Sequence, residues 1–67
     1  MPYASNDDLP RPVRHVLPPH AQDIWRAAFN HAWAAPRTAA DEAACARIAW
    51  SAVKRTYRKD GDAWVRR

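Results

Sequence analysis

Residues 18–35 read PPHAQDIWRAAFNHAWAA and carry the clearest structural pattern in this chain of 67 residues. Their apolar side chains recur at spacings of three and four, which places them along one side of an α-helix. The series is Ala21, Ile24, Trp25, Ala28, Phe29, Ala32 and Trp33. Prolines bound the stretch at both ends, where a ring without an N–H donor does least harm. We predict a helix that begins at Pro18-Pro19, ends near Ala35 before Pro36, and buries this stripe.

A shorter helix is expected just before this stretch. Apolar residues again recur at helical spacing from Leu9 onward, and Pro10 and Pro12 fit a first helical turn. Asp7 or Asp8 could cap the free N–H groups at its start. The pattern predicts a helix from about Leu9 to Val16.

A third helix is expected after Pro36. The residues from Thr38 to Asp41 are close to a capping box, with Asp in place of the usual Glu. The main apolar stripe that follows is Ala43, Ala46, Ala49, Trp50, Val53 and Tyr57. Ile48, with Cys45 and Ala52 nearby, projects from nearly the opposite side, so we expect this helix to be covered on two faces.

The chain ends in a turn and a short extended segment. Asp60-Gly61 marks the turn, since glycine accepts a positive φ without steric cost. The extended segment Ala63–Val65 needs a partner, and Pro2–Ala4 is the other aromatic extended candidate. We predict a mainly α fold: one compact three-helix domain over residues 1–67, with a small two-stranded sheet joining the N- and C-terminal segments.

Aromatic residues are the expected source of stability, because a domain of this size has little surface to bury. The chain has four tryptophans, two tyrosines and one phenylalanine, and a single cysteine that excludes an intramolecular disulfide. We expect that cysteine, Cys45, to be a small buried apolar residue. No signal peptide and no apolar run of membrane-spanning length is visible. The expected protein is soluble and cytoplasmic.

The histidines and carboxylates of residues 15–33 raise the question of a metal or catalytic site. His20 and His31 are eleven residues apart, or about 16 Å along a helix, so one ion cannot join them. His20 and Asp23 have contact spacing, but a site would need a further ligand such as His15. No serine or threonine lies in a nucleophile elbow, and one glycine makes no phosphate-binding loop. We expect no enzyme activity, no metal and no cofactor.

Several motifs in order resemble the ChaB family of proposed cation transport regulators. They are MPY (1–3), DLP (8–10), HVLP (15–18), HAQDI (20–24), AFNHAW (28–33) and IAWSAVKRTY (48–57). The resemblance runs almost end to end. It implies a compact domain of three helices with a small sheet, and a regulatory link to a Na⁺ or Ca²⁺/H⁺ antiporter. Residues 34–47 are shorter and less charged than the loop of some members, so cation sensing by that loop would be absent here.

Two functions remain open at this point. The first is a non-catalytic interaction protein whose partner is a protein, with a cation transporter as the candidate that the resemblance implies. The expected partner surface lies on the exposed sides of the first two helices. Its residues are His20, Asp23, Arg26, Asn30 and His31.

The alternative is a basic accessory protein that binds nucleic acid without sequence specificity. Eleven Lys and Arg against seven Asp and Glu give a formal net charge of +4, which favours anionic partners. The basic residues gather near the C-terminus, where the expected phosphate contacts are Lys54, Arg55, Arg58, Lys59, Arg66 and Arg67. The sequence leaves the identity of the partner and the oligomeric state open.

Overall fold

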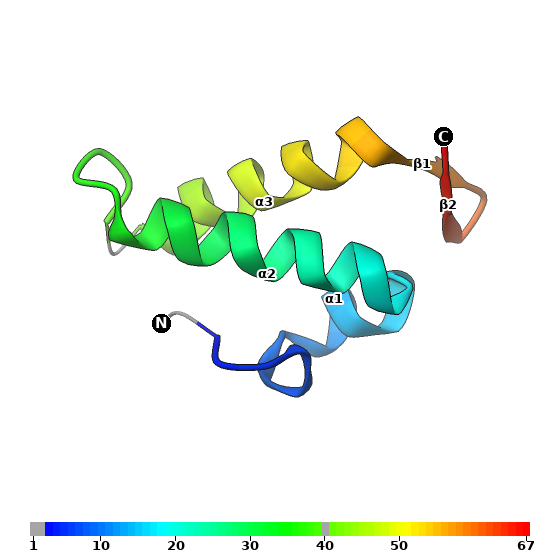
Figure 1. Ribbon diagram of the computed structural model, residues 1–67, viewed down its shortest axis with the longest axis horizontal. Coiled ribbons are helices and arrows are strands. Elements are labelled where there is room, and N and C mark those ends of the chain that lie inside the picture. Colours follow the sequence, from blue (N-terminus) through cyan, green and yellow to red (C-terminus); the bar gives the residue numbers. More distant parts are fainter. Residues whose placement is uncertain (1–2, 40) are drawn as a thin grey trace.

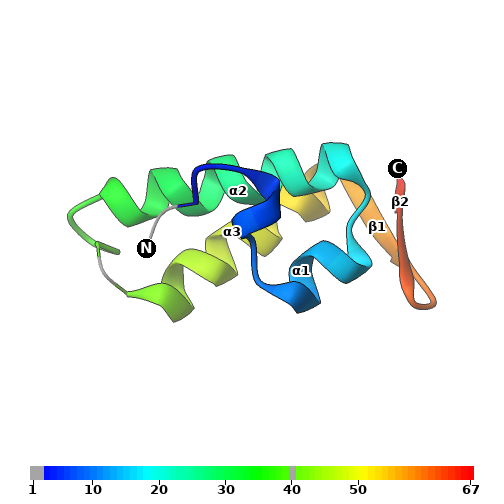
Figure 2. The ribbon, with the colours of Figure 1, turned by 90° about the horizontal axis from the view of Figure 1, so that it is seen from below.

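Two long antiparallel helices form the body of the protein, with the N-terminal part of the chain lying along one side of them (Figures 1 and 2). The computed structural model describes residues 3–39 and 41–67. Along the chain, the helical elements are η1 (Asn6–Asp8, a 3₁₀ turn), α1 (Arg11–Val16), α2 (Pro19–Ala34) and α3 (Glu42–Thr56). A hairpin of β1 (Tyr57–Asp60) and β2 (Ala63–Arg66) follows α3 at one end of the molecule. The mainly α prediction with three helices and a two-stranded sheet is confirmed.

Prolines set the helix boundaries. Leu9, Pro18 and Ala35 each precede a proline, and their ψ angles of 151°, 163° and 136° are extended. The ring of the following proline disfavours the helical conformation at such positions. The boundaries of α2 therefore agree with the prediction to within a residue. The first helix was predicted to start at about Leu9, and α1 begins two residues later, at Arg11. The predicted cap is wrong, because the N-cap residue is Pro10 and neither Asp7 nor Asp8 caps the helix.

The start of α3 also differs from the prediction. Asp41 is the N-cap, and its carboxylate accepts a hydrogen bond from the Ala44 N–H at 3.1 Å. Thr38 does not cap; its hydroxyl donates to the Ala32 carbonyl at the end of α2. The predicted capping box is wrong, since the Thr38 side chain closes the turn between the two helices. Ala40, which lies in that predicted motif, falls outside the described residues.

The core is aromatic, as predicted. Trp25 and Phe29 are each 2% exposed and stack with ring centroids 5.1 Å apart. Trp50 of α3 meets the edge of Trp25 at 6.1 Å and stacks on Trp64 of β2 at 5.5 Å. These contacts connect both long helices and the hairpin through one row of rings. Cys45 is fully buried, which confirms its assignment as a core residue.

The prediction for α3 was wrong about its second face. Cys45, Ala49 and Val53 are buried at spacings of four and form the core side of the helix. Ala43, predicted for the main stripe, is exposed, and Ile48 keeps 41% of its surface exposed. The described part of the chain provides one layer against α3, on the core side. Ile48 therefore lies on an open face.

The sheet is a hairpin, so its predicted pairing between the two termini is wrong. β1 pairs antiparallel with β2, from Tyr57 opposite Arg66 to Asp60 opposite Ala63. Gly61 makes the predicted turn with φ of 63°. Local pairing across a two-residue loop costs little chain entropy compared with pairing the chain ends. Tyr3 binds α2 instead, and Pro2 lies outside the described residues.

Candidate functional site

Helix α2 presents three different faces, and they separate the predicted site residues. Ala21, Trp25, Phe29 and Ala32 face the core. At about 100° per residue, Asp23, Arg26 and Asn30 share a second face. His31 falls on a third face, together with Ile24, Ala27 and Ala28.

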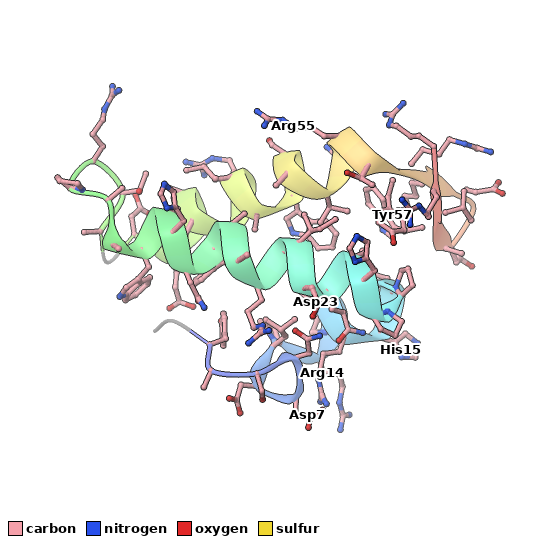
Figure 3. The ribbon with its side chains drawn as sticks, in the orientation of Figure 1. Asp7, Arg14, His15, Asp23, Arg55 and Tyr57 are labelled. Carbon is pink, nitrogen blue, oxygen red and sulfur yellow. The ribbon has the colours of Figure 1, made fainter. Side chains whose placement is uncertain are left out.

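The second face of α2 holds the N-terminal segment, which we define as residues 3–8. The Tyr3 N–H donates to Asn30 Oδ1 and Asn30 Nδ2 donates to the Tyr3 carbonyl, each at 2.8 Å. Arg26 donates to the Ala4 carbonyl at 2.7 Å, and Asn6 Nδ2 donates to Asp23 Oδ1 at 2.7 Å. Figure 3 shows Asp23 on the same side of the molecule as Asp7. Three of the five predicted surface residues therefore bind the protein's own chain.

The pKa of Tyr3 reflects this packing. Its ring lies 4.9 Å from Phe29 and 6.1 Å from Trp25, measured between centroids. Burial raises the pKa of Tyr3 above its ordinary value of 10.0, and the negative charge of Glu42 raises it further. A phenol is already protonated at neutral pH, so the raised pKa of Tyr3 has an effect only in alkaline solution.

The two histidines of the predicted surface lie apart from these three residues and from each other. His20 is exposed at the start of α2, with its ring centroid 6.3 Å from that of Tyr57. His31 is exposed near the other end of α2. The structure does not bring the five residues together into one surface.

The third face of α2 and the exposed face of α3 form an open hollow, which we call the α2–α3 groove. Most of its lining is apolar and built from small or branched side chains. These residues are Ile24, Ala27, Ala28, Ala44, Ile48 and Ala52. Ile48 is the large hydrophobic side chain that is exposed among the described residues. Together these side chains form one apolar strip that extends across both helices.

Basic and hydroxyl side chains complete the groove. They are His31, Thr38, Arg47, Ser51 and Arg55. Figure 3 shows Arg55 on the side of α3 that faces away from the N-terminal segment. The residues that line the groove include no Asp or Glu. The groove therefore combines an apolar floor with positive charge.

A smaller hollow lies where α1, α3 and the hairpin meet. Trp50 and Trp64 line it together with His15, Val16, Lys54, Lys59 and Asp62. Both tryptophans are half-buried and stack on each other, so their rings mainly serve the core. The stacking of Trp64 on Trp50 attaches the hairpin to α3.

The six predicted phosphate contacts lie at the end of α3 and on the hairpin, and all are exposed. In the strand register, Lys59 and Arg66 are on the same face of the hairpin as Tyr57, whereas Arg58 is on the other. Arg67 Nε donates to the Lys54 carbonyl at 2.7 Å, which ties the end of the chain to α3. The basic residues thus surround one end of the molecule without forming a single flat face.

In residues 3–39 and 41–67, no group of three or more His, Cys, Asp and Glu side chains comes close enough to hold a metal ion. Within the same residues, no helix combines the length and apolar character needed to cross a membrane.

The groove was not predicted from the sequence, because Ile48 was expected to lie on a covered face of the third helix. One signal was available. Arg47, Ser51 and Arg55 follow each other at spacings of four and flank Ile48 on its helix face. A row of polar positions beside an apolar one indicates an exposed face more often than a second core.

Comparison with known proteins identifies the family. Residues 9–67 match the ChaB family. The chain belongs to this family. ChaB proteins from Escherichia coli K12 and Shigella flexneri, each named "Putative cation transport regulator ChaB", are 46% identical to it, over 96% of this chain and 95% of the relative.

A solved structure supports the same assignment. An NMR solution structure of a ChaB protein of that name superposes with a TM-score of 0.80 at 42% identity. The match covers 98% of this chain and 99% of the other. The ChaB fold described above is therefore shared along the whole described length.

Proposed function

We propose that this ChaB protein is a non-catalytic regulator that acts in the cytoplasm by binding a protein partner, and that the partner is a cation transport protein. The name of its relatives supports a regulatory role in cation transport. The observation that carries the proposal is the open apolar face of α2 and α3, with Ile48 41% exposed in a small domain. Apolar side chains that gather between two helices, unlike a single exposed one, form a candidate docking surface.

The partner contacts the side of α2 that carries His31. On the opposite side, Asp23, Arg26 and Asn30 are already hydrogen-bonded to residues 3–6. A partner that used those three side chains would have to displace the N-terminal segment. Binding on the His31 side requires no such change.

Regulation of transport is tested directly in everted membrane vesicles from the host. Purified protein is added, and Na⁺/H⁺ and Ca²⁺/H⁺ exchange are followed with a pH-sensitive dye. We expect a saturable change in the rate of one of the two exchanges. Unchanged rates for both ions at saturating protein would refute the proposed function.

A second function is favoured by the gathering of exposed basic side chains at the hairpin end. Such a surface would bind nucleic acid through phosphates, with a salt dependence whose slope rises by nearly one for each phosphate contacted. Duplex DNA is titrated at two salt concentrations with wild type and with Arg58→Gln/Arg66→Gln. Binding that weakens steeply with salt and with the double variant supports this function, and no binding at low salt excludes it.

A further inference from the structure

The floor of the α2–α3 groove suits an α-helix. Alanines contribute from both walls, with Ala27 and Ala28 on α2 and Ala44 and Ala52 on α3. Small side chains allow another helix to approach closely, and interhelical distances of about 8–10 Å depend on such residues. Ile24 and Ile48 supply larger apolar surface on the two walls. A third helix laid along the groove would cover this apolar surface.

The basic side chains at the rim of the groove indicate that a complementary helix would be negatively charged. Arg47 and Arg55 are eight residues apart on α3, which is about 12 Å along the helix axis. Within residues 3–39 and 41–67, neither guanidinium makes an ion pair or a side-chain hydrogen bond. The ion pair there is Arg26–Asp23, on the other side of α2. Arg47 and Arg55 are thus available to carboxylates of a partner.

We propose that the α2–α3 groove binds an acidic amphipathic helix of a protein partner. Apolar residues at i, i+3 or i+4, and i+7 of that helix cover Ile24, Ala28 and Ile48, which is the usual arrangement of a helix in a groove. Two carboxylates placed seven or eight residues apart span the distance between Arg47 and Arg55. This inference rests on the proposed function as a partner-binding regulator and names the chemistry of the partner.

The groove is less suited to two other occupants. In a two-fold dimer the same patch of each copy faces the other. No Asp or Glu lines the groove, so neither copy would supply carboxylates to Arg47 and Arg55 of the other. Single-stranded nucleic acid uses large aromatic side chains on which its bases stack, and no Phe, Tyr or Trp side chain lines this groove. A negatively charged, partly apolar helix is complementary to both floor and rim.

Site-specific photo-crosslinking in the native host identifies the occupant. A benzoylphenylalanine replaces Ser51 in the groove or, as the control, Asp7 in η1 on the opposite side. We expect a protein adduct from position 51 and not from position 7. Mass spectrometry of the adduct should show a segment with helical apolar spacing and flanking Asp or Glu. An adduct to a second copy of the chain, to nucleic acid or to a non-acidic segment overturns the proposal, as does the absence of an adduct.

Charge reversal then measures the role of the rim. A synthetic peptide with the crosslinked sequence is titrated into wild type, Arg47→Glu/Arg55→Glu and Arg58→Glu/Arg66→Glu. Both double variants change the formal net charge by −4, from +4 to 0, so they differ only in location. We expect at least a tenfold loss of affinity for the groove variant and less than threefold for the hairpin variant. Equal losses would show general charge attraction and overturn the proposal.

Two further measurements distinguish a lost contact from a misfolded variant. Circular dichroism verifies the fold of each variant, and Arg47→Gln/Arg55→Gln provides a milder change that should lose at least threefold in affinity. In the vesicle assay, a groove variant that regulates exchange as well as wild type overturns the groove and leaves the proposed function intact. Absence of regulation by wild type refutes the proposed function itself.

Discussion

On one side of α2, Asp23, Arg26 and Asn30 are bonded to residues 3–6, whereas on the other Ala27, Ala28 and His31 face an open groove. We call these the N-terminal flank and the groove flank. Helical spacing did not separate the two flanks, because the predicted partner surface combined Asp23, Arg26 and Asn30 with His31. The N-terminal flank is closed by hydrogen bonds within the chain, and the groove flank keeps Ile48 exposed. Polar side chains on a helix surface thus indicate a partner only after internal partners have been accounted for.

The largest loss of stability is expected from a substitution in the core, which lies between the two flanks. Trp25 is 2% exposed and touches Tyr3, Phe29 and Trp50. Trp25→Ala should cost about 3–5 kcal/mol, since it removes a buried indole and leaves a cavity. A domain of this size has a total stability of roughly 3–10 kcal/mol, so the variant should lose a large share of its free energy of unfolding. Thermal unfolding followed by circular dichroism measures the loss.

Trp25→Phe is the matched control for this change. It keeps an aromatic ring in the stack and removes an indole N–H that is buried without a hydrogen-bond partner in the described residues. We expect this variant to remain folded at 25 °C. A Trp25→Ala protein as stable as Trp25→Phe would show that the two flanks do not depend on a common core.

The next largest effect on the free energy of unfolding is expected on the N-terminal flank. Asn30→Ala removes both hydrogen bonds to the backbone of Tyr3 and leaves a half-buried N–H and C=O without their partner. The expected cost is about 1–2 kcal/mol, because each lost partner of a partly buried group is destabilising. Urea unfolding of the purified variant provides the measurement.

His31→Ala is the control on the groove flank. It changes the adjacent residue, which is exposed. Its effect should stay within about 0.5 kcal/mol, as for other surface positions. If Asn30→Ala were equally mild, the N-terminal segment would contribute nothing to stability and the flanks would be equivalent.

A change of pH should have a smaller effect on the free energy of unfolding, again through the N-terminal flank. The pKa of Tyr3 is raised by burial and then by Glu42, so the folded protein holds the phenolic proton more tightly than the unfolded chain does. The resulting stabilisation is complete below pH 10 and is lost as pH rises through and beyond this value. Urea midpoints at pH 8 and pH 11 should fall more for wild type than for Tyr3→Phe. Equal falls would show that Tyr3 is not linked to folding.

Apart from the control variants, the smallest effect on stability is expected on the groove flank. Ile48→Gln should change the free energy of unfolding by no more than about 0.5–1 kcal/mol, because 41% of the side chain is already exposed. The neighbouring Ala49 is fully buried, and Ala49→Gln should destabilise strongly because it places a polar amide in the core. Urea unfolding of the two variants tests the contrast, and a large loss for Ile48→Gln would mean that the groove is part of the core.

Local features of the sequence determined much of this fold. The apolar spacing of residues 18–35 predicted α2 and its buried face, because helix periodicity is a property of neighbouring residues. Prolines and Gly61 predicted boundaries and a turn for the same reason, since they restrict or extend the φ and ψ angles of their own positions. The aromatic residues predicted the core, and the ordered motifs predicted the family.

Tertiary structure decided the partners of residues distant in the chain. Asn30 is hydrogen-bonded to Tyr3, which lies 27 residues earlier in the chain. No local sequence pattern distinguishes it from an exposed asparagine that binds another protein. The strand at residues 63–66 pairs with β1, its nearest neighbour in the chain, whereas Tyr3 is hydrogen-bonded to α2. Likewise, Ile48 became exposed because the described chain places no segment over that side of α3. Periodicity specifies which faces a helix has, but only the folded arrangement specifies which of them is covered.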